Sequence, residues 1–228
     1  MKKLLPIMLL LLLAACAAPA RVPIPVIEPA PAGLATEDLA SAVWTERPAV
    51  MRLRQTARFS FRGREVPMIG MMELDTRSKK TRLVAVNQMG VKLFDLEVTQ
   101  SGVVEHYLLP QLARYPRFGE AVAVSLRRIF LSPVPIQETD VLETREDGGY
   151  RLSGERNADQ VAFLFGSDPV RLIEQTLRGP KDDWKVVYLD YCLLAEQPYP
   201  REIVLEDRRA GYRLDLRIDS IEHGGNRL

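Results

Sequence analysis

The residue best placed for covalent chemistry is Cys16, which follows Leu13-Ala14-Ala15 near the start of the chain. Two lysines and an apolar run over residues 4–13, broken only by a proline, precede this cysteine. A short basic start, an apolar run of about ten residues and small residues at a cleavage site are typical of a secretory signal. The run is too short to span a bilayer, which takes roughly 20 apolar residues. We therefore predict a signal peptide over residues 1–15. It is a lipoprotein signal peptide if Cys16 is modified; the alternative is an ordinary signal peptide with an incidental cysteine.

The segment Leu13-Ala14-Ala15-Cys16 resembles the lipobox of bacterial lipoproteins. The resemblance implies diacylation of the Cys16 thiol, cleavage after Ala15 and acylation of the new amino terminus. In enteric-type bacteria, Asp at the next position signals inner-membrane retention, whereas this chain has Ala17. By resemblance, we expect an outer-membrane protein that faces the periplasm, and whose acyl chains contact membrane lipid. Two or three chains anchor a protein stably, whereas one does not.

Composition limits the classes of partner. The chain has 228 residues, 46% hydrophobic and 27% charged, with a formal net charge of +1. Loss of the two lysines in the predicted signal peptide would change this to −1. Acidic and basic residues are interleaved, and no basic patch stands out, so we expect no nucleic-acid partner.

Few other residues are suited to chemistry. The sequence has no nucleophile elbow, P-loop, dinucleotide fingerprint or paired-histidine metal motif, and we expect no cofactor, metal or catalytic residue. Its two histidines are His106 and His223, and a general-base role for His106 stays open. The acidic pairs at 182–183 and 206–207 fit solvated turns better than calcium loops. Cys192 lies in an apolar run, where a buried inert thiol is the more frequent role.

Residues 16–35 hold five prolines and several alanines, which predicts an extended tether after the lipidated cysteine. From residue 51 the pattern changes to apolar and polar residues in alternation, which is typical of half-buried strands. Short connections rich in Gly, Asn, Asp and Ser favour an antiparallel meander. Strands are predicted at 51–61, 66–75, 81–87, 91–98 and 103–109.

Helical spacing appears in Phe118 to Leu131, where Arg127 and Arg128 suit the carboxyl end of a helix dipole. Ser132-Pro133 ends this helix. Residues 170–178 are ambiguous, and we interpret them as a short helix or an irregular segment. Further strands are predicted at 141–145, 150–154, 161–165, 184–194, 201–207 and 212–221.

These elements predict a mainly β (α+β) fold: a strongly curved antiparallel sheet, or half-barrel, of about eleven strands with a covering helix. Residues 36–228 form its single domain. The pattern resembles the periplasmic lipoprotein carrier LolA and its receptor LolB in Arg58-Phe59-Ser60-Phe61-Arg62-Gly63, in residues 70–74 and 81–96, and in the helix that follows. The chain also looks like an uncharacterised family of bacterial lipoproteins found beside aryl-polyene lipid biosynthesis genes.

The resemblance implies a concave apolar groove that takes acyl chains. The candidate groove residues are Phe59, Phe61, Met71, Leu83, Leu93 and Phe130. Met89 lies beside Gly90 at a predicted hairpin tip, and in LolB-like receptors an exposed apolar residue on such a loop helps to deliver lipid into the membrane. The alternative for the methionines of this region is ordinary core packing.

Three hypotheses follow. The first is a lipid-anchored, non-enzymatic protein that binds or transfers an acyl ligand, either lipoprotein acyl chains or an aryl-polyene-type lipid. The second is a structural lipoprotein that recruits a transport or biosynthesis complex. The third is a lipid esterase, which needs a Ser or Asp within about 3 Å of His106.

Overall fold

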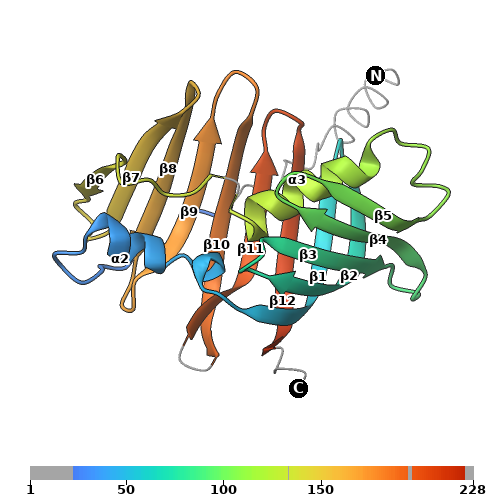
Figure 1. The fold of residues 1–228 in the computed structure, drawn as a ribbon, viewed down its shortest axis with the longest axis horizontal. Coiled ribbons are helices and arrows are strands. Elements are labelled where there is room, and N and C mark those ends of the chain that lie inside the picture. The colour runs from blue at the N-terminus through green and yellow to red at the C-terminus, as the bar shows by residue number, and fades with distance from the viewer. Residues whose placement is uncertain (1–22, 133, 195–196, 224–228) are drawn as a thin grey trace, which may run out of the picture.

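A computed structural model describes residues 23–132, 134–194 and 197–223. The predicted signal peptide, Cys16 and residues 17–22 of the predicted tether lie outside this part of the chain. Figure 1 shows one strongly curved antiparallel sheet with a helix across its concave face. The described strands are β1 (Val50–Phe61), β2 (Arg64–Asp75), β3 (Lys80–Val86), β4 (Lys92–Thr99), β5 (Val103–Leu108), β6 (Val141–Thr144), β7 (Tyr150–Arg156), β8 (Asp159–Gly166), β9 (Arg171–Arg178), β10 (Asp183–Leu194), β11 (Gln197–Asp207) and β12 (Tyr212–His223).

In the described part of the chain, three helical elements accompany the sheet: α2 (Thr36–Ser41), the 3₁₀ helix η1 (Trp44–Glu46) and α3 (Phe118–Phe130). The curved antiparallel sheet with a covering helix confirms the predicted fold class. The structure has twelve strands in its described residues, where the sequence predicted about eleven. The additional strand is β9, so the interpretation of residues 170–178 as helical or irregular was wrong. Gln175 points inward there and is buried, and this polar residue on the inner face obscured the alternation.

The strand order is β5-β4-β3-β2-β1-β12-β11-β10-β9-β8-β7-β6. Every neighbouring pair is a hairpin in sequence except β1 and β12, which pair antiparallel from Met51↔His223 to Phe61↔Tyr212. The first and last strands therefore lie together in the middle of the sheet. The sheet stays open, with β5 and β6 as its two edges.

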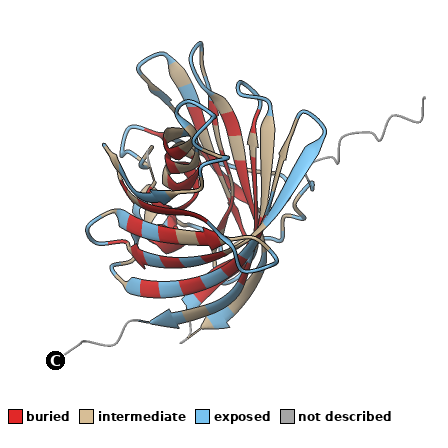
Figure 2. Cartoon of the chain, turned by 90° about the vertical axis from the view of Figure 1, so that its right-hand side faces the viewer, coloured by how far each residue is buried: buried red, intermediate tan, exposed pale blue. Residues whose placement is uncertain are grey.

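The core lies on the concave face. Inward residues of β1 are buried and outward residues are exposed, as the period-two rule requires. Figure 2 shows this alternation along the strands that surround α3. Trp44, Phe94, Phe130 and Phe165 are among the largest fully buried side chains, and Trp44 contacts Phe130 edge-on with ring centroids 5.9 Å apart.

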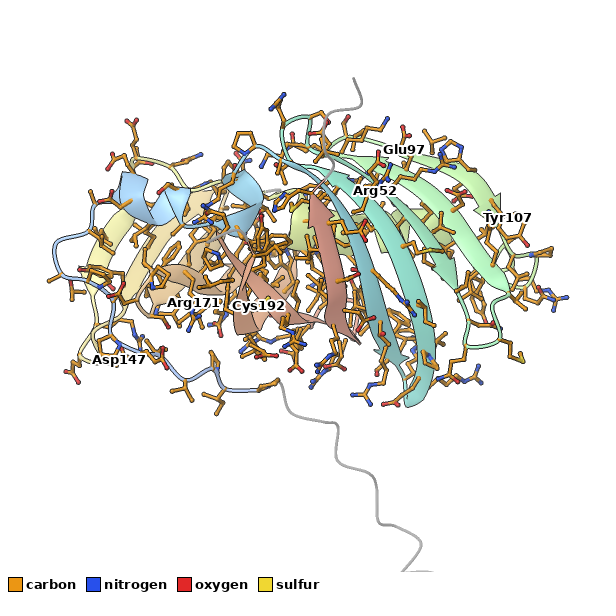
Figure 3. The ribbon with its side chains drawn as sticks, turned by 90° about the horizontal axis from the view of Figure 1, so that it is seen from below. Arg52, Glu97, Tyr107, Asp147, Arg171 and Cys192 are labelled. Atoms are coloured by element: carbon orange, nitrogen blue, oxygen red, sulfur yellow. The ribbon has the colours of Figure 1, made fainter. Side chains whose placement is uncertain are left out.

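Residues 27–31, which we call the strap, are bound to the sheet beside β7 and β8. Figure 3 shows the chain running along one side of the sheet before it turns to α2 on the other side. The strap belongs to the folded domain, so a free tether does not extend to residue 35. Its hydrogen bonds run from Ala30 N to Gly148 O (3.0 Å), from Ser167 N to Glu28 O (2.8 Å) and from Tyr150 Oη to Pro31 O (2.9 Å).

Candidate functional site

An apolar surface lies on the concave face where β1, β2 and β12 meet. Directly paired residues of antiparallel strands share a face of the sheet. Phe59 pairs with both Val66 and Leu214, and Phe61 pairs with Tyr212, so these side chains all point inward. We call the mouth surface the six residues Phe59, Phe61, Val66, Met68, Tyr212 and Leu214.

The mouth surface is incompletely covered. Val66 is 44% exposed although it faces inward, and the other five side chains are half-buried. The rings of Phe59 and Phe61 stack with centroids 6.4 Å apart, and Phe59 lies 5.3 Å from the ring of Tyr212. This aromatic and thioether surface offers dispersion contacts to an apolar ligand and has few competing polar atoms.

Tyr212 connects the mouth surface to α3. Its hydroxyl lies 2.7 Å from Ser125 Oγ, in the middle of the helix. Burial raises the pKa of Tyr212, so the phenol stays neutral and keeps its proton for this hydrogen bond at physiological pH. The helix is therefore fixed over the deeper part of the concave face, while the strand ends beyond it are left partly open.

Below the mouth surface, Gln55 of β1 points into the interior. It is 2% exposed, and its Oε1 has no hydrogen-bond partner among the described residues. Gly70 pairs with Gln55, and a Cβ at Gly70 would lie 3.0 Å from Gln55 Cγ and 2.9 Å from Leu83 Cδ1. The glycine thus makes room for a buried amide whose unsatisfied acceptor costs roughly 1–3 kcal/mol of stability.

A cavity of about 260 Å³ lies under α2 and η1. It is smaller than the pockets of roughly 300–1,000 Å³ that hold drug-sized ligands, so it has room for part of an alkyl chain. Gln175 is a buried polar group on its wall and donates from Nε2 to Val134 O at 3.5 Å. Its lining comprises Ala40, Ser41, Val43, Glu46, Ser132, Val134, Pro135, Ile136, Phe163, Leu172 and Gln175.

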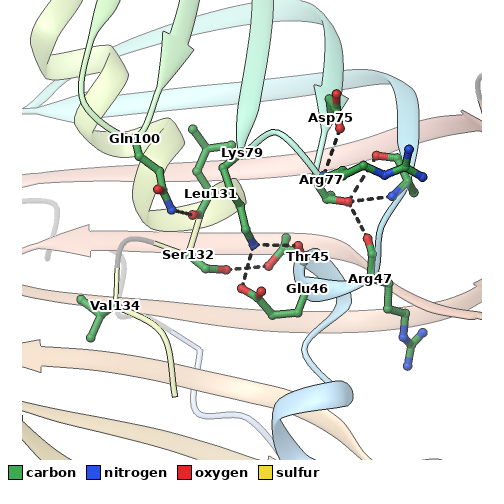
Figure 4. Close-up of polar contacts among 12 residues, drawn as sticks. Thr45, Glu46, Arg47, Asp75, Arg77, Lys79, Gln100, Leu131, Ser132 and Val134 are labelled. Carbon is green, nitrogen blue, oxygen red and sulfur yellow. Dashed lines mark hydrogen bonds and ion pairs between the residues drawn. The ribbon is translucent and has the colours of Figure 1, made fainter. Parts of the chain in front are cut away.

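Polar contacts hold the walls of this cavity together (Figure 4). Thr45 Oγ1 of η1 lies 2.9 Å from Ser132 Oγ, just after α3. Lys79, in the turn between β2 and β3, pairs with Glu46 at 2.9 Å. Because these bonds connect η1 to α3 and to the β2–β3 turn, widening the cavity requires breaking them.

The predicted groove residues occupy three different places. Phe59 and Phe61 belong to the mouth surface. Leu83, Leu93 and Phe130 are 5%, 9% and 0% exposed, and they fill the interior rather than line an open groove. Met71 is 54% exposed on the outer face, because its neighbour Met72 takes the inward position of β2. Met71 is therefore not part of the concave surface.

Met89 lies at the tip between β3 and β4 and is 84% exposed. Asn87 Oδ1 accepts hydrogen bonds from Met89 N at 3.0 Å and from Val91 N at 2.9 Å. Gly90 has φ +79°, a conformation that glycine adopts without strain. The loop is therefore an internally bonded turn that holds an apolar side chain in solvent.

Sequence reasoning missed four residues of the mouth surface: Val66, Met68, Tyr212 and Leu214. Their alternation identified strands, but only the pairing of β1 with β12 places Leu214 beside Phe59.

His106 Nε2 lies 4.0 Å from Glu97 Oε2 near the β5 edge, and no described serine bonds to it. In the described part of the chain, no group of His, Cys, Asp and Glu side chains is arranged to hold a metal ion.

The fold is LolA-like. The structure is similar to a LolA superfamily protein from Nitrosomonas europaea, with a TM-score of 0.52 and 9% identity over 84% of this chain and 92% of the other. A putative outer membrane lipoprotein-sorting protein domain from Vibrio parahaemolyticus gives a TM-score of 0.48 at 6% identity, covering 78% and 88% of the two chains. A DUF1329 family protein from Desulfovibrio piger gives 0.49 at 10% identity, covering 82% and 91%. No curated protein matches the sequence.

The family model of DUF3261, described as a protein of unknown function, matches residues 52–220, which is most of the chain. The protein belongs to this family. The matched span begins in β1 and ends in β12, so it covers the whole sheet. No described helix is long and apolar enough to cross a membrane.

Proposed function

We propose that this protein binds an acyl chain on its mouth surface and carries or transfers it at a membrane to which it is anchored through Cys16. The observation that carries this proposal is the exposure of inward-facing apolar residues, above all Val66 at 44%. Core side chains of a sheet face are normally covered, and exposed apolar surface on a concave face favours a ligand. Similarity of fold to a LolA superfamily protein supports the proposal by analogy only.

The energetics favour an alkyl ligand. Each methylene moved from water into an apolar site contributes about 0.8 kcal/mol, so a few buried methylenes give useful binding without a polar anchor. The mouth surface has aromatic rings, a thioether and aliphatic groups, and these adapt to a flexible chain. The ligand we propose is the acyl part of a lipoprotein or an aryl-polyene-type lipid. Binding and release need neither cofactor nor covalent chemistry, so we propose a non-enzymatic function at the periplasmic side of the outer membrane.

The decisive experiment is native mass spectrometry of the chain from Ala17 onward, which keeps the strap. Extra mass that organic extraction releases as acyl lipid supports the proposal and identifies the ligand class. A bare chain that also fails to bind fatty acids or lipopeptides in titration contradicts it.

Two methionines of β2 provide a matched pair of variants, Met68→Gln and Met71→Gln. Met68 lies on the mouth surface, and Met71 lies on the outer face of the same strand. We expect Met68→Gln to weaken binding of a fluorescent fatty acid by about tenfold, since burying a methionine contributes roughly 1.5–3 kcal/mol when complete. Met71→Gln should leave the affinity unchanged. Equal affinities for both variants would place the ligand elsewhere.

A second candidate function is recruitment of a transport or biosynthesis complex. The edge strand β5 favours it, because Val104 and Tyr107 are 52% and 38% exposed there. Figure 3 shows Tyr107 at the outer limit of the sheet. An unpaired edge strand is a template for strand addition by another chain. Crosslinking from a photoreactive group at Val104 to a protein partner, with no bound lipid in the mass spectrum, would favour this function.

A further inference from the structure

Four exposed arginines that form no ion pair within the described part of the chain lie at one end of the strands. The ends of β1, β3 and β5 and the starts of β2 and β4 all lie at this end because the strands are antiparallel. We call the arginine rim the four residues Arg62, Arg64, Arg114 and Arg117, in the β1–β2 turn and in the loop between β5 and α3. All four are exposed, and none has an ion pair with any described residue.

Arginines elsewhere in the fold are mostly neutralised. Arg82 pairs with Asp95 at 3.0 Å, and Arg217 pairs with Glu202 at 3.0 Å. In residues 61–66, 86–92 and 108–118, the only carboxylate is that of Glu65, which faces outward toward Arg58. The amino terminus of α3 begins at Phe118 in the same region, but the carboxylate of Glu105 lies against Gly119 there and offsets the positive end of the helix dipole. These turns and this loop therefore have a net positive charge, although the protein as a whole is nearly neutral.

Exposed apolar side chains lie among these charges. Met89 is 84% exposed, Val91 46% and Tyr115 59%, and all three are in turns or loops at this end. Basic residues close to an anionic bilayer attract its headgroups, while tyrosine and small apolar groups enter the interface. The arginine rim thus combines both features of a surface that lies on a membrane.

The start of the described chain lies near this rim. Pro23 lines a hollow on the outer face together with Arg58 and Arg213, and Arg58 is three positions before the end of β1 at Phe61. The strap fixes the chain that follows. Seven peptide steps lead back from Pro23 to Cys16, and they span at most about 25 Å. A lipid on Cys16 would hold the domain close to the bilayer, with the arginine rim near the point of attachment.

We propose that the arginine rim binds the anionic phospholipid surface of the membrane, with Met89 and Tyr115 entering its interface. This inference deepens the proposed function and rests on it, because it places the mouth surface against the bilayer from which a ligand enters or into which it leaves. Arg64 pairs with Phe61 and faces inward at the edge of the mouth surface, so the two surfaces adjoin.

The test uses the chain from Ala17 onward, which contains every described residue and lacks the lipid. Its flotation with phosphatidylcholine vesicles is compared with flotation on vesicles that also contain phosphatidylglycerol. We expect binding that requires phosphatidylglycerol and weakens with salt, because the attraction to headgroups is screened. Arg114→Gln combined with Arg117→Gln should weaken partitioning about thirtyfold, given the contribution of each basic residue near an anionic surface.

The matched control combines Arg54→Gln with Arg77→Gln, which removes the same charge from exposed arginines away from the rim. It should bind like the wild-type chain. Equal loss in both double variants, equal binding to neutral vesicles, or no binding to either vesicle overturns the inference. Titration of the wild-type chain with a fluorescent fatty acid in solution keeps the two proposals apart. Acyl binding without vesicle binding refutes only the membrane surface, and vesicle binding without acyl binding refutes only the ligand.

Discussion

Arg128, near the end of α3, donates a hydrogen bond from Nη1 to Oδ2 of Asp207 in β11 at 2.5 Å, and the two residues are only 6% and 4% exposed. The guanidinium also bonds to Asp182 at 2.9 Å and lies 5.4 Å from the ring centroid of Trp184. The preceding residue, Arg127, bonds instead to the carbonyls of Thr99 and Gly102 at the β4–β5 turn. Two consecutive arginines therefore attach α3 to both halves of the curved sheet.

The first prediction concerns this attachment. Arg128→Met should lower the free energy of unfolding by about 3–5 kcal/mol, because it leaves the buried carboxylate of Asp207 without an opposite charge, with the backbone N–H of Ala210 still bonded to it. Urea denaturation measures the loss. Arg114→Met, at an exposed position, should change stability by less than about 0.5 kcal/mol. Similar values for the two variants would mean that the buried ion pair contributes little to the position of α3.

The second prediction concerns Gln55. Gln55→Leu should raise the free energy of unfolding by about 1–3 kcal/mol, because it removes a buried acceptor that has no partner and adds apolar volume. Gln111→Leu, at an exposed loop position, is the control and should be neutral. If Gln55→Leu is stabilising but weakens acyl binding, the amide is retained for function. If the Gln55→Leu variant is instead less stable than the wild-type protein, the amide of Gln55 has its hydrogen-bond partners in solution.

The third prediction concerns Met89. Met89→Ser should weaken binding to vesicles containing phosphatidylglycerol by about tenfold, since an exposed methionine loses its transfer into the interface. Its urea midpoint should stay at the wild-type value, because the turn is held by Asn87 rather than by the Met89 side chain. Met71→Ser removes a comparable exposed methionine from the outer face and should bind like wild type. Parallel losses in the two variants would show a general effect of hydrophobicity.

The fourth prediction concerns the strap. A chain that starts at Thr36 should be less stable than one that starts at Pro23 by about 2–4 kcal/mol, because it loses the hydrogen bonds of the strap, including those of Glu28 to Ser167 and Arg171, and the packing of Ile27. Urea denaturation of the two chains gives the difference. Equal midpoints would show that residues 23–35 are a dispensable spacer.

The fifth prediction concerns pH. Burial alone would raise the pKa of Asp140, but hydrogen bonds from Arg156 at 2.7 and 2.8 Å and from Gln137 N at 2.9 Å outweigh it, and the pKa lies below its ordinary value of 3.8. Because the folded-state pKa is depressed, the stabilisation is fully present above the unfolded value and is lost as the pH falls through the folded-state value.

Asp140→Asn should therefore reduce stability at neutral pH by about 1.5–3 kcal/mol and flatten the fall in stability below pH 3.8. Denaturation curves across the acid range measure both effects. Glu138→Gln, at an exposed position two residues away, is the control and should keep the slope of the wild-type chain. An unchanged slope for Asp140→Asn would assign the acid sensitivity to other carboxylates.

Strands were predictable wherever inward and outward residues alternate over a long run. In β1 the inward Leu53, Ala57 and Phe59 alternate with exposed polar residues, and both the strand and its buried face followed from the sequence. β9 was not predictable in this way, because the adjacent Leu172 and Ile173 are both buried at a register shift and Gln175 follows on the inner face. Met71 was misplaced because the methionines were grouped by their chemistry rather than by their parity along β2.

The candidate site was less predictable than the fold, because it is assembled across distant strands. Phe59 and Leu214 are neighbours only through the β1–β12 pairing, for which no turn provides a local signal. The arginine rim has the same origin: Arg62 and Arg117 are far apart in sequence, and interleaved acidic residues elsewhere hide their accumulation. Composition described the average charge correctly and gave no information about its distribution.

The pairing of β1 with β12 also determines when the chain can fold. Hairpins such as β1–β2 or β10–β11 close between neighbours, but Met51 must wait for His223, which is synthesised much later. Closing so long a loop has a high entropic cost, and folds dominated by distant pairings form slowly. Until β12 arrives, β1 and β11 each present an unpaired edge beside apolar surface. We therefore expect the nascent protein to be prone to aggregation until β12 has been made, and truncation within β12 would leave both edges unpaired.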